Sequence, residues 1–112
     1  RTIIAKHAYQ FTAAWARLYK RKALQGLSFP EGMIYEDVLF SVQLWCSNAT
    51  CRQIPYAGYY YTTNPTSTTS KRNQEAEQRI MRELRLLLKG QTCRNKAIIL
   101  FTILRLKIHF KL

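Results

Sequence analysis

Carboxylates are the side chains of this chain best suited to acid–base chemistry, and they are few. The six acids are Glu31, Glu36, Asp37, Glu75, Glu77 and Glu83, so Asp37 is the only aspartate. A single aspartate excludes an Asp-x-Asp metal site within the chain, and it argues against a self-contained hydrolase built on two separated carboxylates. Glu36 and Asp37 open a segment of helical periodicity, where the positive end of the helix dipole should keep Asp37 ionised. Taken alone, such a pair is more often structural, because acidic residues are common at helix starts for capping reasons.

The cysteine and histidine side chains give weaker indications of a functional site. The three cysteines, Cys46, Cys51 and Cys93, have no C-x-x-C spacing, and the two histidines, His7 and His109, lie far from them in sequence. A structural zinc site needs four ligands, so the sequence predicts none. We interpret the cysteines as reduced thiols of a cytosolic protein, and the histidines as ordinary surface or packed residues.

Three aromatic- and charge-rich segments follow one another in a fixed order. They read WARLYKR at residues 15–21, FPEG at residues 29–32 leading to YED at residues 35–37, and YYY at residues 59–61 leading to STT at residues 67–69. This succession resembles the C-terminal, acceptor-side part of the catalytic domain of family-2 glycosyltransferases. Members of that family show Trp-x-x-Leu-Tyr-Lys-Arg, then Phe-Pro-x-Gly-x-x-Tyr-Glu-Asp, then a Tyr-x-Tyr strand that runs into a Ser/Thr loop. The resemblance covers about residues 10–72.

The resemblance implies an inverting transfer of a sugar from a nucleotide-sugar donor to an acceptor hydroxyl, in polysaccharide or glycoconjugate synthesis. By the same resemblance, Asp37 is the base that takes the proton of the acceptor hydroxyl, and Glu36 is its neighbour in the pair. We expect Trp15, Tyr35, Tyr60 and Tyr61 to be candidates for acceptor contacts, although such rings more often belong to a core. One departure is Thr62, which stands where members often carry an arginine.

The resemblance also implies a larger enzyme. The family's N-terminal half holds the nucleotide-binding fold and an Asp-x-Asp motif that binds Mg²⁺ or Mn²⁺, and this chain contains neither. We therefore expect the chain to be an excised part of a GT-A domain, inactive by itself and without a metal site of its own. An exposed apolar surface intended for the other half would favour self-association.

The elements expected to position these residues are mainly helices with a few short strands, an α+β class. Apolar residues spaced by three and four predict helices over residues 35–47 and from Asn73 to Gly90. Helix is also favoured for residues 1–13, for residues 20–24 and, over an alternating strand-like pattern, for residues 97–112. Short strands are predicted at residues 14–19, 51–56 and 59–63. Strand alternation would send Tyr60 to the face opposite Tyr59 and Tyr61.

Charge divides the chain unevenly. The net charge is +12, from 18 Lys and Arg against six acids. Residues 1–70 form the expected acceptor-side part of the catalytic domain, and residues 71–112 form a basic C-terminal helical segment. No apolar run reaches the roughly 20 residues that cross a bilayer. We expect a cytoplasmic protein whose basic segment either binds the inner face of the cell membrane peripherally or packs on the catalytic part.

Two other classes of function fit parts of the sequence. The positive charge is typical of a small nucleic-acid-binding module, although no zinc finger or RNA-binding signature accompanies it. A non-catalytic interaction module that keeps the fold without the chemistry is the second. Loss of sugar transfer after Asp37→Asn would separate the enzyme from the interaction module, and a steep loss of affinity for a defined oligonucleotide with added salt would support the nucleic-acid-binding module.

Overall fold

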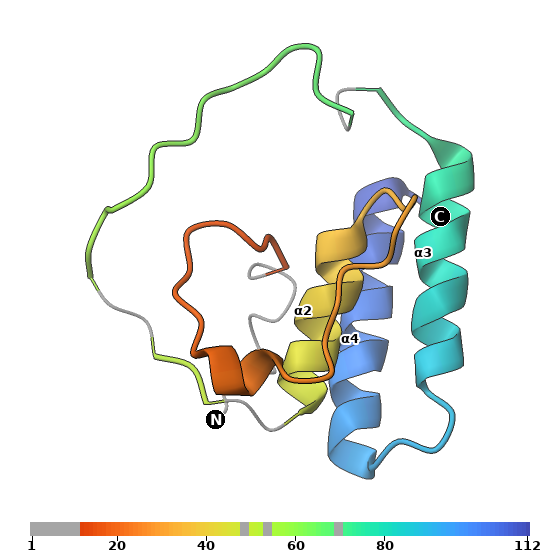
Figure 1. The fold of residues 1–112 in the computed structure, drawn as a ribbon. Helices are drawn as coiled ribbons and strands as arrows, with labels where there is room; N and C mark the ends of the chain where they lie inside the picture. The colour runs from red at the N-terminus through yellow and green to blue at the C-terminus, as the bar shows by residue number, and fades with distance from the viewer. Residues whose placement is uncertain (1–11, 48–49, 53–54, 69–70) are drawn as a thin grey trace.

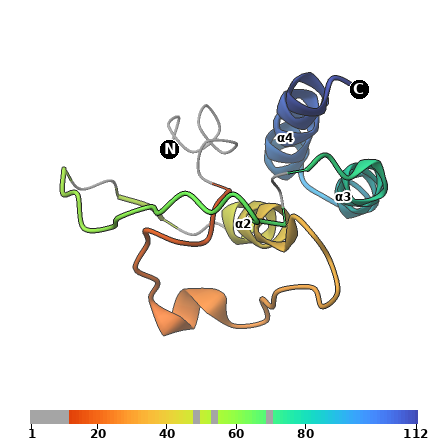
Figure 2. The same ribbon diagram turned by 90° about the horizontal axis from the view of Figure 1, so that it is seen from above.

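The computed structural model describes residues 12–47, 50–52, 55–68 and 71–112. Within these ranges the elements are a short 3-10 helix, η2 (Arg21–Leu24), and three α-helices, α2 (Glu36–Cys46), α3 (Gln74–Leu87) and α4 (Cys93–Phe110). Figure 1 shows the three α-helices side by side, and the described parts of the segment between α2 and α3 form a wide, extended loop. Seen from above, α2 and α3 both lie on one side of α4 (Figure 2).

The helix α2 begins where its sequence predicts. Gly32 adopts a φ of 61° in the turn that precedes it, a left-handed conformation that glycine accepts without strain. The apolar stripe of α2 is buried, with Val38 5%, Val42 0% and Trp45 4% exposed. Its buried face packs on α3 and α4 in one hydrophobic core that also contains Met33. The core therefore combines residues from before and after position 70, the predicted boundary between the acceptor-side part and the basic C-terminal segment.

The helix α3 is started by a side-chain cap. The Asn73 side-chain oxygen accepts a hydrogen bond of 3.0 Å from the backbone N–H of Ala76, as the capping prediction required. Its apolar face packs inward, and Ile80 and Leu84 are fully buried. The chain then turns at Gly90, which has a φ of 71°.

The segment with the alternating pattern is helical as far as Phe110. Helix α4 runs to Phe110, and its buried residues follow a spacing of three and four: Ile98, Ile99, Thr102, Ile103, Leu106 and Phe110. The preference for helix over strand is therefore confirmed. The period-two appearance of residues 104–112 arises because basic residues and His109 alternate with apolar residues of two kinds. Leu106 and Phe110 are buried, whereas Leu104, Ile108 and Leu112 are more than half exposed.

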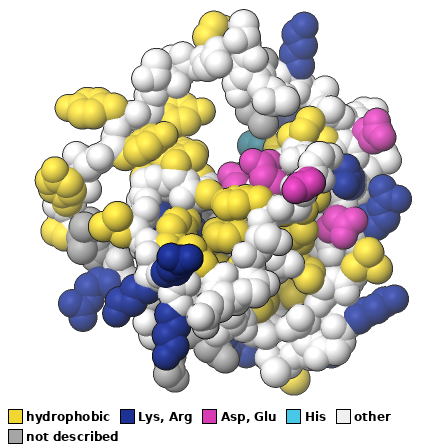
Figure 3. Space-filling model, in the orientation of Figure 1, with side chains coloured by type: hydrophobic (Ala, Val, Ile, Leu, Met, Phe, Trp, Pro, Cys, Tyr) yellow, Lys and Arg dark blue, Asp and Glu magenta, His cyan; other side chains and the backbone are white. Residues whose placement is uncertain are grey.

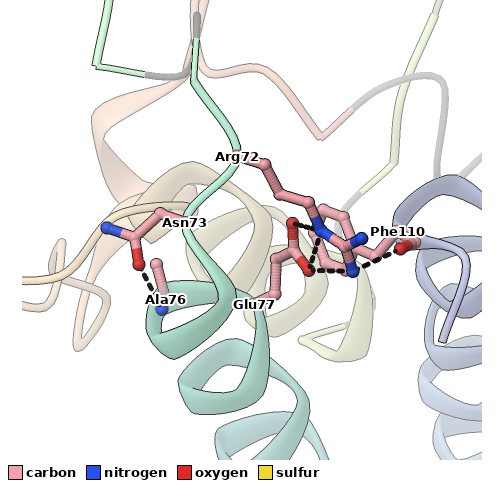
Figure 4. Close-up of polar contacts among 5 residues, drawn as sticks. All are labelled: Arg72, Asn73, Ala76, Glu77 and Phe110. Carbon is pink, nitrogen blue, oxygen red and sulfur yellow. Dashed lines mark hydrogen bonds and ion pairs between the residues drawn. The ribbon is translucent and has the colours of Figure 1, made fainter.

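An ion pair fastens the end of α4 to the beginning of α3. Arg72 donates to both carboxylate oxygens of Glu77, with a shortest distance of 3.0 Å, and also to the Phe110 carbonyl at 2.8 Å (Figure 4). Glu77 is only 3% exposed, so its charge depends on this partner. The clamp holds Phe110 and the last turn of α4 close to the start of α3.

The predicted strands are wrong, and with them the α+β class. Within the described residues no strand forms: residues 14–16 bend, and the described parts of 51–56 and 59–63 run as extended loop. An isolated strand leaves its backbone N–H and C=O groups without a ladder, and no second strand lies beside these segments to complete one. The described chain is helical and does not show the sheet of a GT-A domain. The helix predicted over residues 1–13 falls almost wholly outside the described residues.

Candidate functional site

Asp37, itself half-buried, lines a shallow cavity that is open to solvent at the start of α2. The cavity has a volume of about 300 Å³ and is lined by residues from three parts of the chain: Thr12, Ala13, Tyr35, Asp37, Val38, Leu106, His109 and Phe110. Glu36 is absent from this lining, so the two adjacent acids point differently, as expected for neighbours on a helix. On the face shown in Figure 3, acidic side chains gather near the centre beside hydrophobic surface, and most Lys and Arg stand toward the margin.

Burial acts against the charge of Asp37. The pKa of its carboxyl is raised above the ordinary value of 3.8, first because burial removes it from water and second because of the negative charge of Glu36. Backbone N–H groups at the helix start and the positive charge of Arg17 act in the opposite direction. The helix start therefore favours the carboxylate as predicted, but desolvation outweighs it. A base with a raised pKa accepts a proton more readily than an ordinary aspartate does.

Tyr35 forms the wall of the cavity next to Asp37. It is the residue before α2, and it adopts a left-handed backbone with a φ of 66°. Such a conformation is unfavourable for a residue with a side chain, and it is found at sites where the surrounding structure imposes it. The ring of Tyr35 lies 5.2 Å from the ring of Phe110, measured between centroids. Burial and the charge of Glu77 raise the pKa of the Tyr35 hydroxyl.

The turn that precedes Tyr35 and Asp37 is held in place by a hydrogen bond from α3. Arg79 donates a hydrogen bond of 2.8 Å to the Gly32 carbonyl. Phe29, in the same turn region, stacks on Phe40 with centroids 4.2 Å apart. The backbone that leads into the Glu36-Asp37 pair is thus attached to the core at two points.

Arg17 connects the first described segment to α2. Its guanidinium donates to the Ser41 hydroxyl at 3.4 Å and lies 5.6 Å from the ring centroid of Trp45. The buried Ser41 hydroxyl in turn donates to the Thr12 carbonyl at 2.6 Å. These contacts bring residues 12–17 against α2, and the charge of Arg17 lowers the pKa of Asp37. The sequence shows Arg17 only as a variable position within the first motif.

The other predicted aromatic contacts do not gather at Asp37. Trp15 stacks with Tyr59 and Tyr61, at centroid distances of 5.0 and 5.1 Å. Tyr60 points elsewhere and is 95% exposed. Tyr59 and Tyr61 therefore contact the same ring, although the strand for which the alternation was predicted does not form. Of the four predicted acceptor contacts, only Tyr35 lines the cavity of Asp37.

Sequence reasoning missed the contribution of α4 to this site. Leu106, His109 and Phe110 line the cavity from the last turns of that helix. They lie about 70 positions from Asp37, and no local motif connects them to it. The sequence signal that could have indicated them is a helical period extended to Phe110, because this period places residues 106 and 110 on the inward face of the helix.

The described residues contain no group of three or more His, Cys, Asp or Glu side chains that could hold a metal ion. No helix in the described part of the chain combines the length and apolarity needed to cross a bilayer. No family model, curated protein or solved structure was found to match this chain.

Proposed function

We propose that this chain is the acceptor-side part of an inverting glycosyltransferase and that Asp37 is its catalytic base. The observation that carries the proposal is the position of Asp37, which lines a cavity while burial raises its pKa. The ordered motifs at residues 15–21, 29–37 and 59–69 supply the reaction class. The helical architecture does not contribute to this argument.

The chemistry requires one proton acceptor beside the acceptor hydroxyl. As the hydroxyl oxygen forms its bond to the anomeric carbon, the bond from that carbon to the diphosphate breaks, and the nucleoside diphosphate leaves with the electron pair. The hydroxyl proton passes to the Asp37 carboxylate. Because attack and departure occur on opposite faces of the sugar, the anomeric configuration inverts.

The cavity is suited to an acceptor with both apolar and polar surface. Tyr35 and Phe110 present aromatic rings, which stack on the C–H faces of sugars, and Thr12 and His109 add polar groups. The volume of about 300 Å³ is at the lower end of the range for small-molecule sites.

The donor site belongs to other residues in this proposal. A nucleotide sugar is held in such enzymes by a nucleotide-binding fold, and Mg²⁺ or Mn²⁺ on an Asp-x-Asp motif neutralises the departing diphosphate. With one aspartate and no described metal-ligand cluster, this chain does not fit that role. Its own contribution is the base and the acceptor wall.

The proposal is tested by sugar transfer in the full-length protein that carries this chain. We expect Asp37→Asn to lower kcat by about 10²- to 10⁴-fold, because the amide cannot accept the proton. Glu75→Gln, a change of the same kind at an exposed acid on α3, is the matched control and should retain activity. Wild-type turnover in Asp37→Asn, with the fold verified by circular dichroism, would reject the assigned base.

A further inference from the structure

Helix α4 has a second apolar face that the described helices α2 and α3 leave uncovered. Its inward side packs on α2 and α3, which both lie on one side of it (Figure 2). On the opposite side, Leu100 is 53%, Leu104 56% and Ile108 67% exposed. A spacing of four places these three side chains in one stripe on consecutive turns. Large aliphatic side chains in such an arrangement form a continuous apolar strip rather than scattered exposed residues.

Cations border this stripe on both sides. With about 100° of rotation per residue, Lys96 and Lys107 fall along one edge, and Arg94 and Arg105 fall along the other. Lys111 extends the positive charge beyond the helix end. Residues 93–112 contain five cations and no acid. Long basic side chains beside an apolar strip can extend away from it and place their charges at the level of lipid headgroups.

We propose that the Leu100–Leu104–Ile108 stripe of α4 binds the surface of an anionic lipid bilayer, with the helix lying in the plane of the interface. The stripe inserts among the upper acyl chains while the bordering cations contact anionic headgroups. Charge complementarity selects this occupant over a second copy, since each copy carries +12 and the stripe is surrounded by cations. One face of the basic segment thus packs on the core and the other faces lipid. This inference does not depend on the proposed chemistry of Asp37.

The test is sedimentation of the chain with vesicles of phosphatidylcholine alone and of phosphatidylcholine mixed with phosphatidylglycerol. We expect binding to the mixed vesicles and much weaker binding to the neutral ones. Leu104→Ser should weaken binding to the mixed vesicles about fivefold to tenfold, because it removes apolar surface without changing the charge. Leu86→Ser makes the same change at a leucine on α3 that is 50% exposed, and it should stay within about twofold of wild type.

Several results would overturn the inference. Equal binding of wild type and Leu104→Ser would show that charge alone attracts the protein, and an equal loss in Leu86→Ser would show that the stripe has no special role. Preference for a duplex oligonucleotide over the mixed vesicles in direct competition would assign the surface to nucleic acid. If Leu104→Ser alters the circular dichroism spectrum, Ile108→Ser serves as the second variant with the same expectations.

Discussion

At the scale of single residues, Asp37 differs from the other acids because its surroundings act against its charge. Burial and the neighbouring Glu36 raise its pKa, whereas Arg17 lowers it. Catalytic groups are commonly placed in environments that shift their pKa values, at some cost to stability. The same residue should therefore influence both the chemistry and the folding equilibrium.

We predict that Asp37→Asn makes the folded chain more stable at pH 7. A raised pKa means that the folded state holds the proton to higher pH than the unfolded state does. Asp37 therefore favours folding only at low pH, and this contribution is lost as the pH rises from 3.8 through the raised value. Urea unfolding should give a higher midpoint for the variant at pH 7 and nearly equal midpoints at pH 3. A lower midpoint for the variant at pH 7 would contradict the burial of an unfavourable charge.

The sequence supplies the acid pair but not its environment. Glu36 and Asp37 can be selected because they follow a Pro- and Gly-containing turn and begin a helical pattern. Because the two acids are adjacent, the effect of the Glu36 charge on the pKa of Asp37 can also be anticipated. The positions of Arg17 and His109 relative to Asp37 cannot, because they depend on how residues 12–17 and the end of α4 pack against α2.

At the scale of elements, periodicity identified the helices because each has a face buried in the common core. The spacing of Val38, Val42 and Trp45 in α2 and the Asn73 cap of α3 both have structural counterparts. The strand predictions at residues 51–56 and 59–63 used residue propensity alone. Aromatic residues favour strands only when a neighbouring strand and a packed face are available, and the exposed Tyr56 and Tyr60 have no such face.

The orientation of α4 gives a direct mutational test. Ile99 is fully buried and its neighbour Leu100 is 53% exposed. Ile99→Ala should lower the free energy of unfolding by about 2–5 kcal/mol because it leaves a cavity in the core, whereas Leu100→Ala should change it by less than about 0.5 kcal/mol. Chemical denaturation of the two variants makes the comparison. Equal losses would mean that α4 does not present the described face to α2 and α3.

At the scale of the whole molecule, the candidate site exists because distant segments converge. Residues 12–13, the beginning of α2 and the end of α4 line one cavity, and the Arg72–Glu77 clamp holds the last turn of α4 in place. Net charge predicted only that anionic partners are favoured. The structure shows where part of this positive charge lies, since the cations of α4 border the apolar face that α2 and α3 leave uncovered.

The most direct test of the central claim is the pH dependence of kcat/KM for sugar transfer by the full-length protein. If Asp37 is the base, activity falls on the acid side as its carboxylate becomes protonated. Glu36→Gln removes a charge that raises the pKa of Asp37, so it should move this acid limb to lower pH. Arg17→Gln removes a charge that lowers the same pKa, so it should move the limb to higher pH. Opposite displacements are the predicted result; an acid limb that neither variant moves would contradict a catalytic role for Asp37.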